Sequence, residues 1–241
     1  MTQDSLSTKA IPVDERLIVA LDLPDADAAK HLVRGIGPAC RFYKVGLELF
    51  MAGGYFDLVE WLRAQDKRVF CDLKFFDVPE TVGRAVRRLR DREVDFATVH
   101  GNDTMLEAAA REKGDVKILA VTVLTSLDRS DLDSLGFACD VEELVLSRAR
   151  KALRLGCDGV ISSGLEAPRL RADLGENFLV VTPGIRPVDN RPVDDQKRTV
   201  DIEQAFRNGA DYVVIGRPIR DAADPRVAAE QAQRQIAGVF G

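Results

Sequence analysis

The sequence lacks several features that would place it in other protein classes. No apolar run approaches the roughly 18 residues that a membrane-spanning helix requires, so no spanning segment is predicted. Its two histidines are too few for a histidine-rich metal site. A net charge of -5 provides no basic field for a nucleic-acid backbone, so any bound phosphate must be held locally. The cysteines show no Cys-x-x-Cys spacing and are expected to be reduced, small hydrophobic residues: Cys40, Cys71, Cys139 and Cys157.

Length and composition are those of an ordinary globular protein. The 241 residues, 46% hydrophobic and 30% charged, are enough for one barrel-sized domain or for two small ones. The first fifteen residues include Asp4, Asp14 and Glu15 and contain no apolar core of a signal peptide. We therefore expect a polar lead-in over residues 1–14, one folded domain over residues 15–241, and a cytoplasmic location.

Short apolar runs that are typical of strands recur along the chain and alternate with segments of helical spacing. The strands are expected near residues 16–22, 42–46, 69–73, 95–100, 117–124, 159–163, 178–182 and 212–216. The main helices are expected near residues 25–35, 48–65 with a break at Gly53-Gly54, 79–90, 104–112, 141–155 and 225–236. Continuously apolar strands indicate a sheet that is covered on both faces. No Gly-x-Gly-x-x-Gly motif follows the first strand, which counts against a dinucleotide-binding fold. Eight such units predict an α/β protein with a single-domain (β/α)8 TIM barrel.

Polar residues stand where these strands end, at the face where barrels of this kind place their active sites. For several of them a purely structural role is the alternative. Asp22 could only cap a helix, Lys44 could point its tip to solvent, and His100 fits a hydrogen-bonded strand terminus better than a catalyst. The set is Asp22, Lys44, Asp72, Lys74, His100, Thr125, Ser126, Thr182, Pro183, Gly216 and Arg217.

The stretch from Val69 to Thr81 carries the densest charges. It begins as a buried strand and then places Asp72, Lys74 and Asp77 where the strand ends. On an extended backbone, side chains two residues apart leave from the same face, so Asp72 and Lys74 should interact. A nearby carboxylate raises the pKa of a lysine, whereas burial lowers it. A salt bridge at a strand end is the simpler interpretation; the ring of polar strand ends favours a catalytic pair.

Two similar motifs indicate a phosphate site. Thr182-Pro-Gly-Ile-Arg186 and Val214-Ile-Gly-Arg-Pro218 each place a glycine close to an arginine, after the seventh and eighth strands. Backbone N–H groups beside glycine can approach an anion while a guanidinium binds it, and these loops commonly hold phosphate in barrels. Surface arginines are the alternative. Residues 187–200 are too polar for a core and are interpreted as a mobile flap, from which Gln196 could reach a ligand.

Together these motifs resemble the orotidine 5'-phosphate decarboxylase family. The resemblance runs from the first strand to the eighth, in the family's order: Ala-Leu-Asp22, Tyr-Lys44-Val-Gly, Asp72-Leu-Lys74-Phe-Phe-Asp77-Val-Pro-Glu-Thr81, Val-Thr-Val-Leu-Thr125-Ser126, Thr-Pro-Gly-Ile-Arg186, Asp-Gln196 and Val-Ile-Gly216-Arg217. It implies a homodimeric barrel that converts orotidine 5'-monophosphate to UMP and CO2 in de novo UMP biosynthesis. No metal and no organic cofactor is implied.

The resemblance also implies a role for each motif residue. Lys74 would protonate the ring carbon that loses CO2, and Asp72 would lie beside the departing carboxylate. Asp77 and Thr81 would enter the active site of the partner subunit and complete the charged row with Lys44. The substrate-binding residues would be Asp22 and Lys44 at the ribose hydroxyls, Ser126 with its neighbour Thr125 at the pyrimidine, Arg186, Gly216 and Arg217 at the phosphate, Pro183 in the same motif as Arg186, and Gln196 bridging phosphate and base.

Two other functions are open at this point. A sister decarboxylase, such as the one that acts on 3-keto-L-gulonate 6-phosphate, shares the Asp-x-Lys-x-x-Asp pattern but uses magnesium. A barrel that binds a nucleotide and catalyses nothing is the second alternative. A binder has no need of an intact charged row, which favours the decarboxylase.

Overall fold

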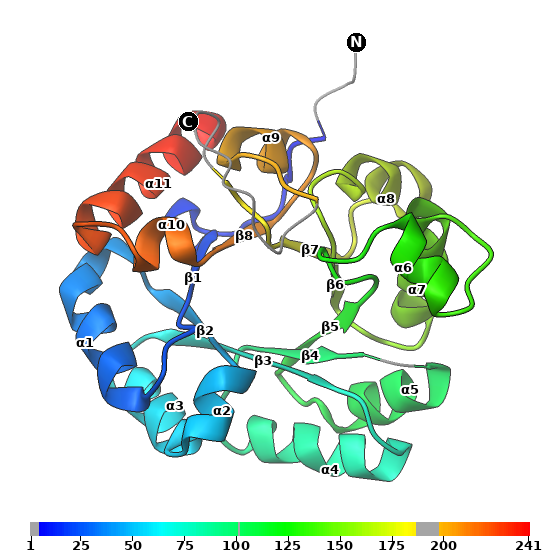
Figure 1. The fold of residues 1–241 in the computed structure, drawn as a ribbon, viewed down its shortest axis with the longest axis horizontal. Coiled ribbons are helices and arrows are strands. Elements are labelled where there is room, and N and C mark those ends of the chain that lie inside the picture. The colour runs from blue at the N-terminus through cyan, green and yellow to red at the C-terminus, as the bar shows by residue number, and fades with distance from the viewer. Residues whose placement is uncertain (1–4, 101, 187–197) are drawn as a thin grey trace.

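The computed structural model describes residues 5–100, 102–186 and 198–241 and contains a closed barrel of eight parallel strands (Figure 1). Neighbouring strands in the sequence pair with one another, and β8 pairs with β1 to close the ring. The strands are β1 Leu17–Ala20, β2 Phe42–Gly46, β3 Arg68–Phe75, β4 Phe96–Val99, β5 Lys117–Val121, β6 Gly159–Ile161, β7 Leu179–Thr182 and β8 Tyr212–Ile215. The predicted (β/α)8 barrel is therefore confirmed.

The helices form an outer ring around the strands (Figure 1). They are α1 Ala26–Ile36, α2 Leu47–Ala52, α3 Tyr55–Ala64, α4 Pro79–Arg90, α5 Asp103–Glu112, α6 Arg129–Ser134, α7 Val141–Arg154, α8 Ala167–Leu174, α9 Ile202–Arg207, α10 Arg217–Arg220 and α11 Pro225–Phe240, with short 3-10 turns η1 Val13–Glu15 and η2 Gly37–Ala39. None of the helices in the described ranges is long and apolar enough to cross a membrane. All four cysteines are free, as expected.

Side-chain caps explain where several helices begin. The carboxylate of Asp25 accepts a hydrogen bond from the backbone N–H of Ala28 at 2.8 Å, and Asp140 does the same for Glu143 at 2.8 Å. These bonds satisfy N–H groups that the first turn of a helix leaves without a partner. The predicted break at Gly53-Gly54 separates α2 from α3, and both glycines have positive φ values of 87° and 68°.

The apolar core has two layers. One lies inside the barrel and includes Phe42, Phe70, Phe96 and Tyr212; the other lies between the sheet and the helices. The aromatic rings inside the barrel pack edge to face, with Phe42 and Phe96 at a centroid distance of 4.9 Å and Phe96 and Tyr212 at 5.1 Å. This cluster, here called the aromatic floor, fills the middle of the barrel.

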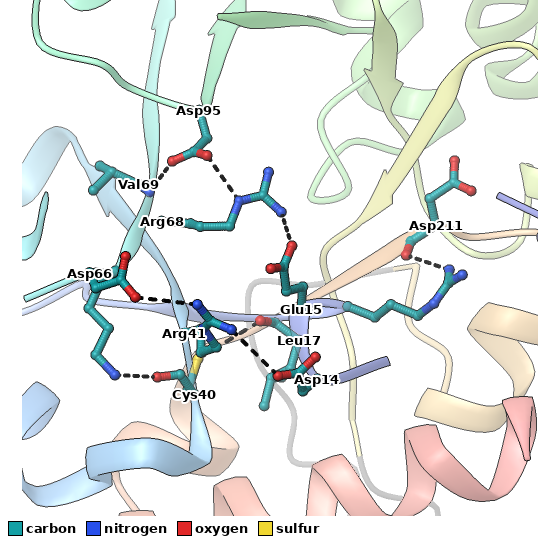
Figure 2. A network of polar contacts seen from close by, with 12 residues as sticks. Asp14, Glu15, Leu17, Cys40, Arg41, Asp66, Arg68, Val69, Asp95 and Asp211 are labelled. Carbon is teal, nitrogen blue, oxygen red and sulfur yellow. Dashed lines mark hydrogen bonds and ion pairs between the residues drawn. The ribbon is translucent and has the colours of Figure 1, made fainter. Parts of the chain in front are cut away.

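Charged groups close the amino end of the barrel below the aromatic floor. Arg68 donates to Asp95 at 2.9 Å and to Glu15 at 2.7 Å, as Figure 2 shows. Its guanidinium also lies 4.3 Å from the ring centroid of Phe42. Polar contacts here are structural, which leaves the opposite, carboxyl end as the open mouth.

Candidate active site

A cavity of about 540 Å³ opens at the carboxyl end of the strands. It combines ten of the thirteen predicted site residues with a wall of apolar side chains. The predicted residues in the lining are Asp22, Lys44, Asp72, Lys74, Thr125, Ser126, Pro183, Arg186, Gly216 and Arg217. The further lining residues are Ala20, Phe70, Val121, Leu124, Ile161, Gly184, Val214 and Arg220. Residues from β1, β2, β3, β5, β6, β7 and β8, or from the loops that follow them, therefore meet in one cavity.

Lys44 and Asp72 lie one side-chain layer closer to the carboxyl end of the barrel than the aromatic floor. Side chains two residues apart on a strand point to the same face. Phe42 is followed in this way by Lys44 on β2, and Phe70 by Asp72 on β3. The barrel interior thus changes from apolar to charged between one side-chain layer and the next. The ionic groups therefore lie directly against apolar side chains.

Two lysines and two aspartates alternate along one side of the cavity. Lys44 Nζ lies 2.8 Å from Asp22 Oδ1 and 3.4 Å from Asp72 Oδ2, and Lys74 Nζ lies 2.9 Å from Asp72 Oδ2. The side chains of Lys44 and Asp72 are each 11% exposed, whereas that of Lys74 is 38% exposed. Asp72 is therefore shared between two cations, and Lys74 is the more exposed of the two lysines that line the cavity.

The environment shifts the pKa values of the buried members in the direction that keeps them charged. Burial alone would raise the pKa of Asp72, but Lys44, Lys74 and hydrogen bonds outweigh it and hold the pKa below its usual range. Burial would lower the pKa of Lys44, but Asp72 and Asp22 outweigh it and raise the pKa. The surroundings of Lys44 and Asp72 therefore favour the charged forms of both side chains.

The route by which Asp72 and Lys74 meet differs from the predicted one. A regular extended strand was expected at this point, but Lys74 has a φ of +47°, in the left-handed region. The β3–β4 register shifts between Cys71 and Phe75, because β3 advances four residues where β4 advances two. A β-bulge, which re-aims side chains near active sites, brings the lysine to its carboxylate. The predicted contact is present, and the predicted backbone was wrong.

The part of the cavity that follows β7 and β8 carries arginines and glycines. Arg186 is buried, and Gly184 before it has a φ of +76°, a conformation that suits glycine. Arg217 is the first residue of α10 and Gly216 is its N-cap. Both predicted arginine motifs thus meet at one wall, where N–H groups and guanidinium groups are the donors that an anion requires.

Arg220 was missed by the sequence analysis. It lines the cavity, and its guanidinium donates to the backbone carbonyl of Asp22 and forms an ion pair with Asp221. It lies three residues after Arg217, so the two share one face of α10. That spacing was the available signal.

Asp77 and Thr81 are not among the described residues that line this chain's cavity. Asp77 is exposed, and its carboxylate accepts from the backbone N–H of Val78 at 2.6 Å. Thr81 lies in the first turn of α4. His100 directly follows β4 and lies outside the lining as well; its backbone N–H donates to the carbonyl of Phe75, in line with the predicted strand terminus.

Gln196 and most of the predicted flap lie outside the described residues. Residues 198–200, at the end of that segment, are described, and they are more buried than predicted. Val200 is 4% exposed and bridges Ile185, and Arg198 forms an ion pair with the buried Glu166. The interpretation of residues 187–200 as too polar for the core was therefore wrong at Val200.

The donor groups of the cavity favour an anionic ligand with a second polar end. Within residues 5–100, 102–186 and 198–241, no three His, Cys, Asp or Glu side chains gather closely enough to hold a metal ion. The arrangement offers an anion site after β7 and β8 and a lysine held against a carboxylate on β3. It can therefore anchor a phosphate and deliver a proton to a reacting atom some distance from it.

Comparisons with known proteins point to one family. A curated orotidine 5'-phosphate decarboxylase of Methylococcus capsulatus is 70% identical over 235 residues, which cover 98% of this chain and 97% of that protein. One from Stenotrophomonas maltophilia is 50% identical, over 94% of this chain and 95% of its own. A crystal structure of orotidine 5'-phosphate decarboxylase from Lactobacillus acidophilus superimposes with a TM-score of 0.82 and 35% identity, over 92% of this chain and 99% of that one. The model of the orotidine 5'-phosphate decarboxylase / HUMPS family matches residues 15–232. The chain belongs to this family.

Proposed function

We propose that this protein is an orotidine 5'-phosphate decarboxylase, a carboxy-lyase that converts orotidine 5'-monophosphate to UMP and CO2 in UMP biosynthesis. The observation that carries the proposal is the alternating row of Asp22, Lys44, Asp72 and Lys74 in a cavity that Arg186 and Arg217 also line. The high identity to curated decarboxylases supports the same activity. The direct test is to incubate the protein with orotidine 5'-monophosphate and to follow the loss of substrate absorbance together with CO2 release.

Lys74 is the proton donor in this proposal. Loss of CO2 from a ring carbon without an adjacent electron sink leaves a localised carbanion, which a cation already in place stabilises. The Lys74 ammonium is held at 2.9 Å from Asp72 and is the more exposed of the two lysines. It can therefore lie against the carbanion and transfer its proton. Asp72 would lie beside the departing carboxylate and orient both lysines.

The remaining residues bind the nucleotide. The phosphate would lie at Arg186, Gly216 and Arg217, next to Pro183, where backbone and guanidinium donors converge. Asp22 and Lys44 would hold the ribose hydroxyls. The pyrimidine would lie between these groups, against two further lining residues, Thr125 and Ser126. Gln196 is proposed to bridge phosphate and base on the strength of its motif alone.

We also propose a homodimer in which Asp77 and Thr81 of the partner subunit complete each active site. Support comes from the surface around them, because Phe76 and Val78 are 68% and 61% exposed although they are large and apolar. Leu47 and Met51 on α2 are likewise 61% and 77% exposed. Mixing two inactive variants tests the proposal.

In that mixture, Lys74→Ala and Asp77→Ala subunits should exchange and form heterodimers with one intact site. A heterodimer carries both lesions in one site and neither in the other, so activity should return to roughly a quarter of the wild-type value at equal mixing. Analytical ultracentrifugation gives the mass independently. A monomer, or a mixture that stays inactive although heterodimers form, would contradict the shared site.

The metal-dependent sister activity is separated by a chelator. The matched family covers HUMPS proteins as well as orotidine 5'-phosphate decarboxylases, so membership in the family does not by itself distinguish one activity from another. The proposed enzyme uses no metal or organic cofactor and should keep its full turnover of orotidine 5'-monophosphate after treatment with EDTA. Turnover that disappears with EDTA and returns with magnesium would favour the sister activity.

Location and domain organisation complete the proposal. We expect one barrel domain over residues 15–241. We also expect the enzyme to act in the cytoplasm, where it would contribute to UMP synthesis. Cell fractionation with an assay for CO2 release tests the location. Limited proteolysis tests the domain, since residues 15–241 should stay together as one folded unit, whether or not the proposed flap is cut.

A further inference from the structure

Thr98 is a buried polar residue that neither the sequence analysis nor the proposed mechanism uses. It lies on β4 with 0% exposure, two residues after Phe96 of the aromatic floor. Its side chain therefore points into the barrel at the level of the charged row. Its hydroxyl is within hydrogen-bond distance of two neighbours, Asp72 and Lys74.

Each of these two hydrogen bonds has only one possible direction. The backbone N–H of Lys74 can only donate, so the Thr98 oxygen accepts from it at 3.0 Å. The ionised carboxylate of Asp72 can only accept, so the Thr98 hydroxyl proton goes to Asp72 Oδ1 at 2.9 Å. Lys74 Nζ binds the other oxygen, Oδ2. One hydroxyl thus connects the backbone of the lysine to the carboxylate that its own side chain contacts.

The backbone at Lys74 needs such a partner. Its φ of +47° is an uncommon conformation for a residue with a side chain, and it lies within the β3–β4 bulge. A bulge interrupts the ladder of backbone hydrogen bonds, so the Lys74 N–H is without the usual strand partner. The Thr98 oxygen takes the place of that partner.

We propose that Thr98 is a positioning residue whose hydroxyl holds the bulge that carries Lys74 and fixes the carboxylate of Asp72. A closed arrangement of Thr98, Asp72 and Lys74 sets the place of the ammonium relative to an anchored substrate. The inference rests on the proposed decarboxylation, because the displaced group would be its proton donor.

The charged and titratable groups around Asp72 and Lys74 come from neighbouring strands and from two helices. Lys44 on β2 and Lys74 on β3 contact Asp72 directly, and Asp22 after β1 shares Lys44 with it. Cys71 on β3 and Tyr55 on α3 interact with Asp72 electrostatically. His100, which follows β4, interacts with Lys74 and with Arg148 on α7. Burial lowers the pKa of His100, assisted by Arg148 and Lys74. The Thr98 hydrogen bond is one of the interactions that lower the pKa of Asp72. Its loss should therefore raise that pKa and move the acid limb of the kcat/KM profile to higher pH.

Two substitutions of opposite kind test the proposal. Thr98→Val keeps the shape of the side chain and removes the hydroxyl, whereas Thr98→Ser keeps the hydroxyl and removes a methyl group. We expect kcat for orotidine 5'-monophosphate to fall about 10- to 100-fold in Thr98→Val, since small displacements of reacting groups cost that much. KM and the Kd for UMP should change little, because the phosphate wall is untouched. Thr98→Ser should stay close to the wild type in kcat and in its acid limb.

A packing role would give the reverse order, since the methyl group matters for packing and the hydroxyl does not. Equal kcat values in Thr98→Val and Thr98→Ser, or a lower value in Thr98→Ser, would overturn the inference. If Thr98→Val fails to fold, as judged by its melting curve, Thr98→Cys replaces it in the comparison. A wild-type protein that releases no CO2 would refute the proposed function and this inference with it. A wild type that is active, with variants in the wrong order, would refute only the role of Thr98.

Discussion

Lys74→Ala is the substitution that bears most directly on the proposed reaction. It removes the ammonium that lies 2.9 Å from Asp72, on a side chain that lines the cavity. Proton transfer by a positioned group contributes about 10²- to 10⁴-fold, and a charge aimed at the transition state about 10²- to 10³-fold. The combined loss in kcat is then roughly 10⁴- to 10⁷-fold, or about 5–10 kcal/mol in activation free energy.

The fold should survive the change. Lys74 is 38% exposed on its side chain, and Asp72 keeps its contacts with Lys44 at 3.4 Å and with Thr98 at 2.9 Å. UMP binding should therefore remain measurable by calorimetry while CO2 release is lost. Lys151→Ala is a matched control, because this lysine on α7 is 49% exposed and lies 3.6 Å from Asp103. Turnover in Lys74→Ala within tenfold of the control would refute the assignment of the proton donor.

Three further outcomes follow from the same cavity. Arg217→Ala should raise KM about 10- to 100-fold, as expected for the loss of a charge-assisted hydrogen bond; an unchanged KM in steady-state assays would move the phosphate elsewhere. An alanine methyl group at Gly46 would lie 3.2 Å from the Asp22 carboxylate, so Gly46→Ala should lower kcat/KM, whereas Gly35→Ala, with open space around its Cβ, should not. The pKa of Asp72 is lower in the folded state than its unfolded-state value of about 3.9, so the ionised carboxylate stabilises the fold above that pH. This stabilisation is lost as the pH falls through the pKa of the folded state. The free energy of unfolding, measured with denaturant, should thus fall less between about pH 5 and 3 in Asp72→Asn than in the wild type. An equal fall in both proteins would contradict this linkage.

Much of the barrel could be predicted because its strands are continuous apolar runs. Each predicted strand corresponds to an observed one, with ends that differ by a few residues. The helix α8 was missed because Ala167–Leu174 is short, is interrupted by charges, and begins at a residue whose side chain makes no cap. The six-residue helix α9 was missed because Ile202–Arg207 is too short to show a period.

The site was predicted in its residues more than in its geometry. Asp22, Lys44 and Asp72 were recognisable because charges at the ends of apolar strands are costly unless they are used. The bulge at Lys74 was not recognisable, because no glycine marks the positive φ and the cause lies in the pairing with β4. Thr98 was missed for the same reason: a threonine in a strand is ordinary, and only the fold reveals what its hydroxyl touches.

The aromatic floor has a consequence for how this enzyme could be altered. Phe42, Phe70, Phe96 and Tyr212 pack edge to face at centroid distances of 4.9 to 6.0 Å and form a rigid base below Lys44 and Asp72. A smaller side chain in place of one of these rings would let Lys44 and Lys74 shift toward the barrel interior and would admit water there. The turnover of every substrate should then fall to a similar extent. Engineering a new preference for the base or the sugar should therefore begin with the loops around the mouth, where a change can distinguish one ligand from another.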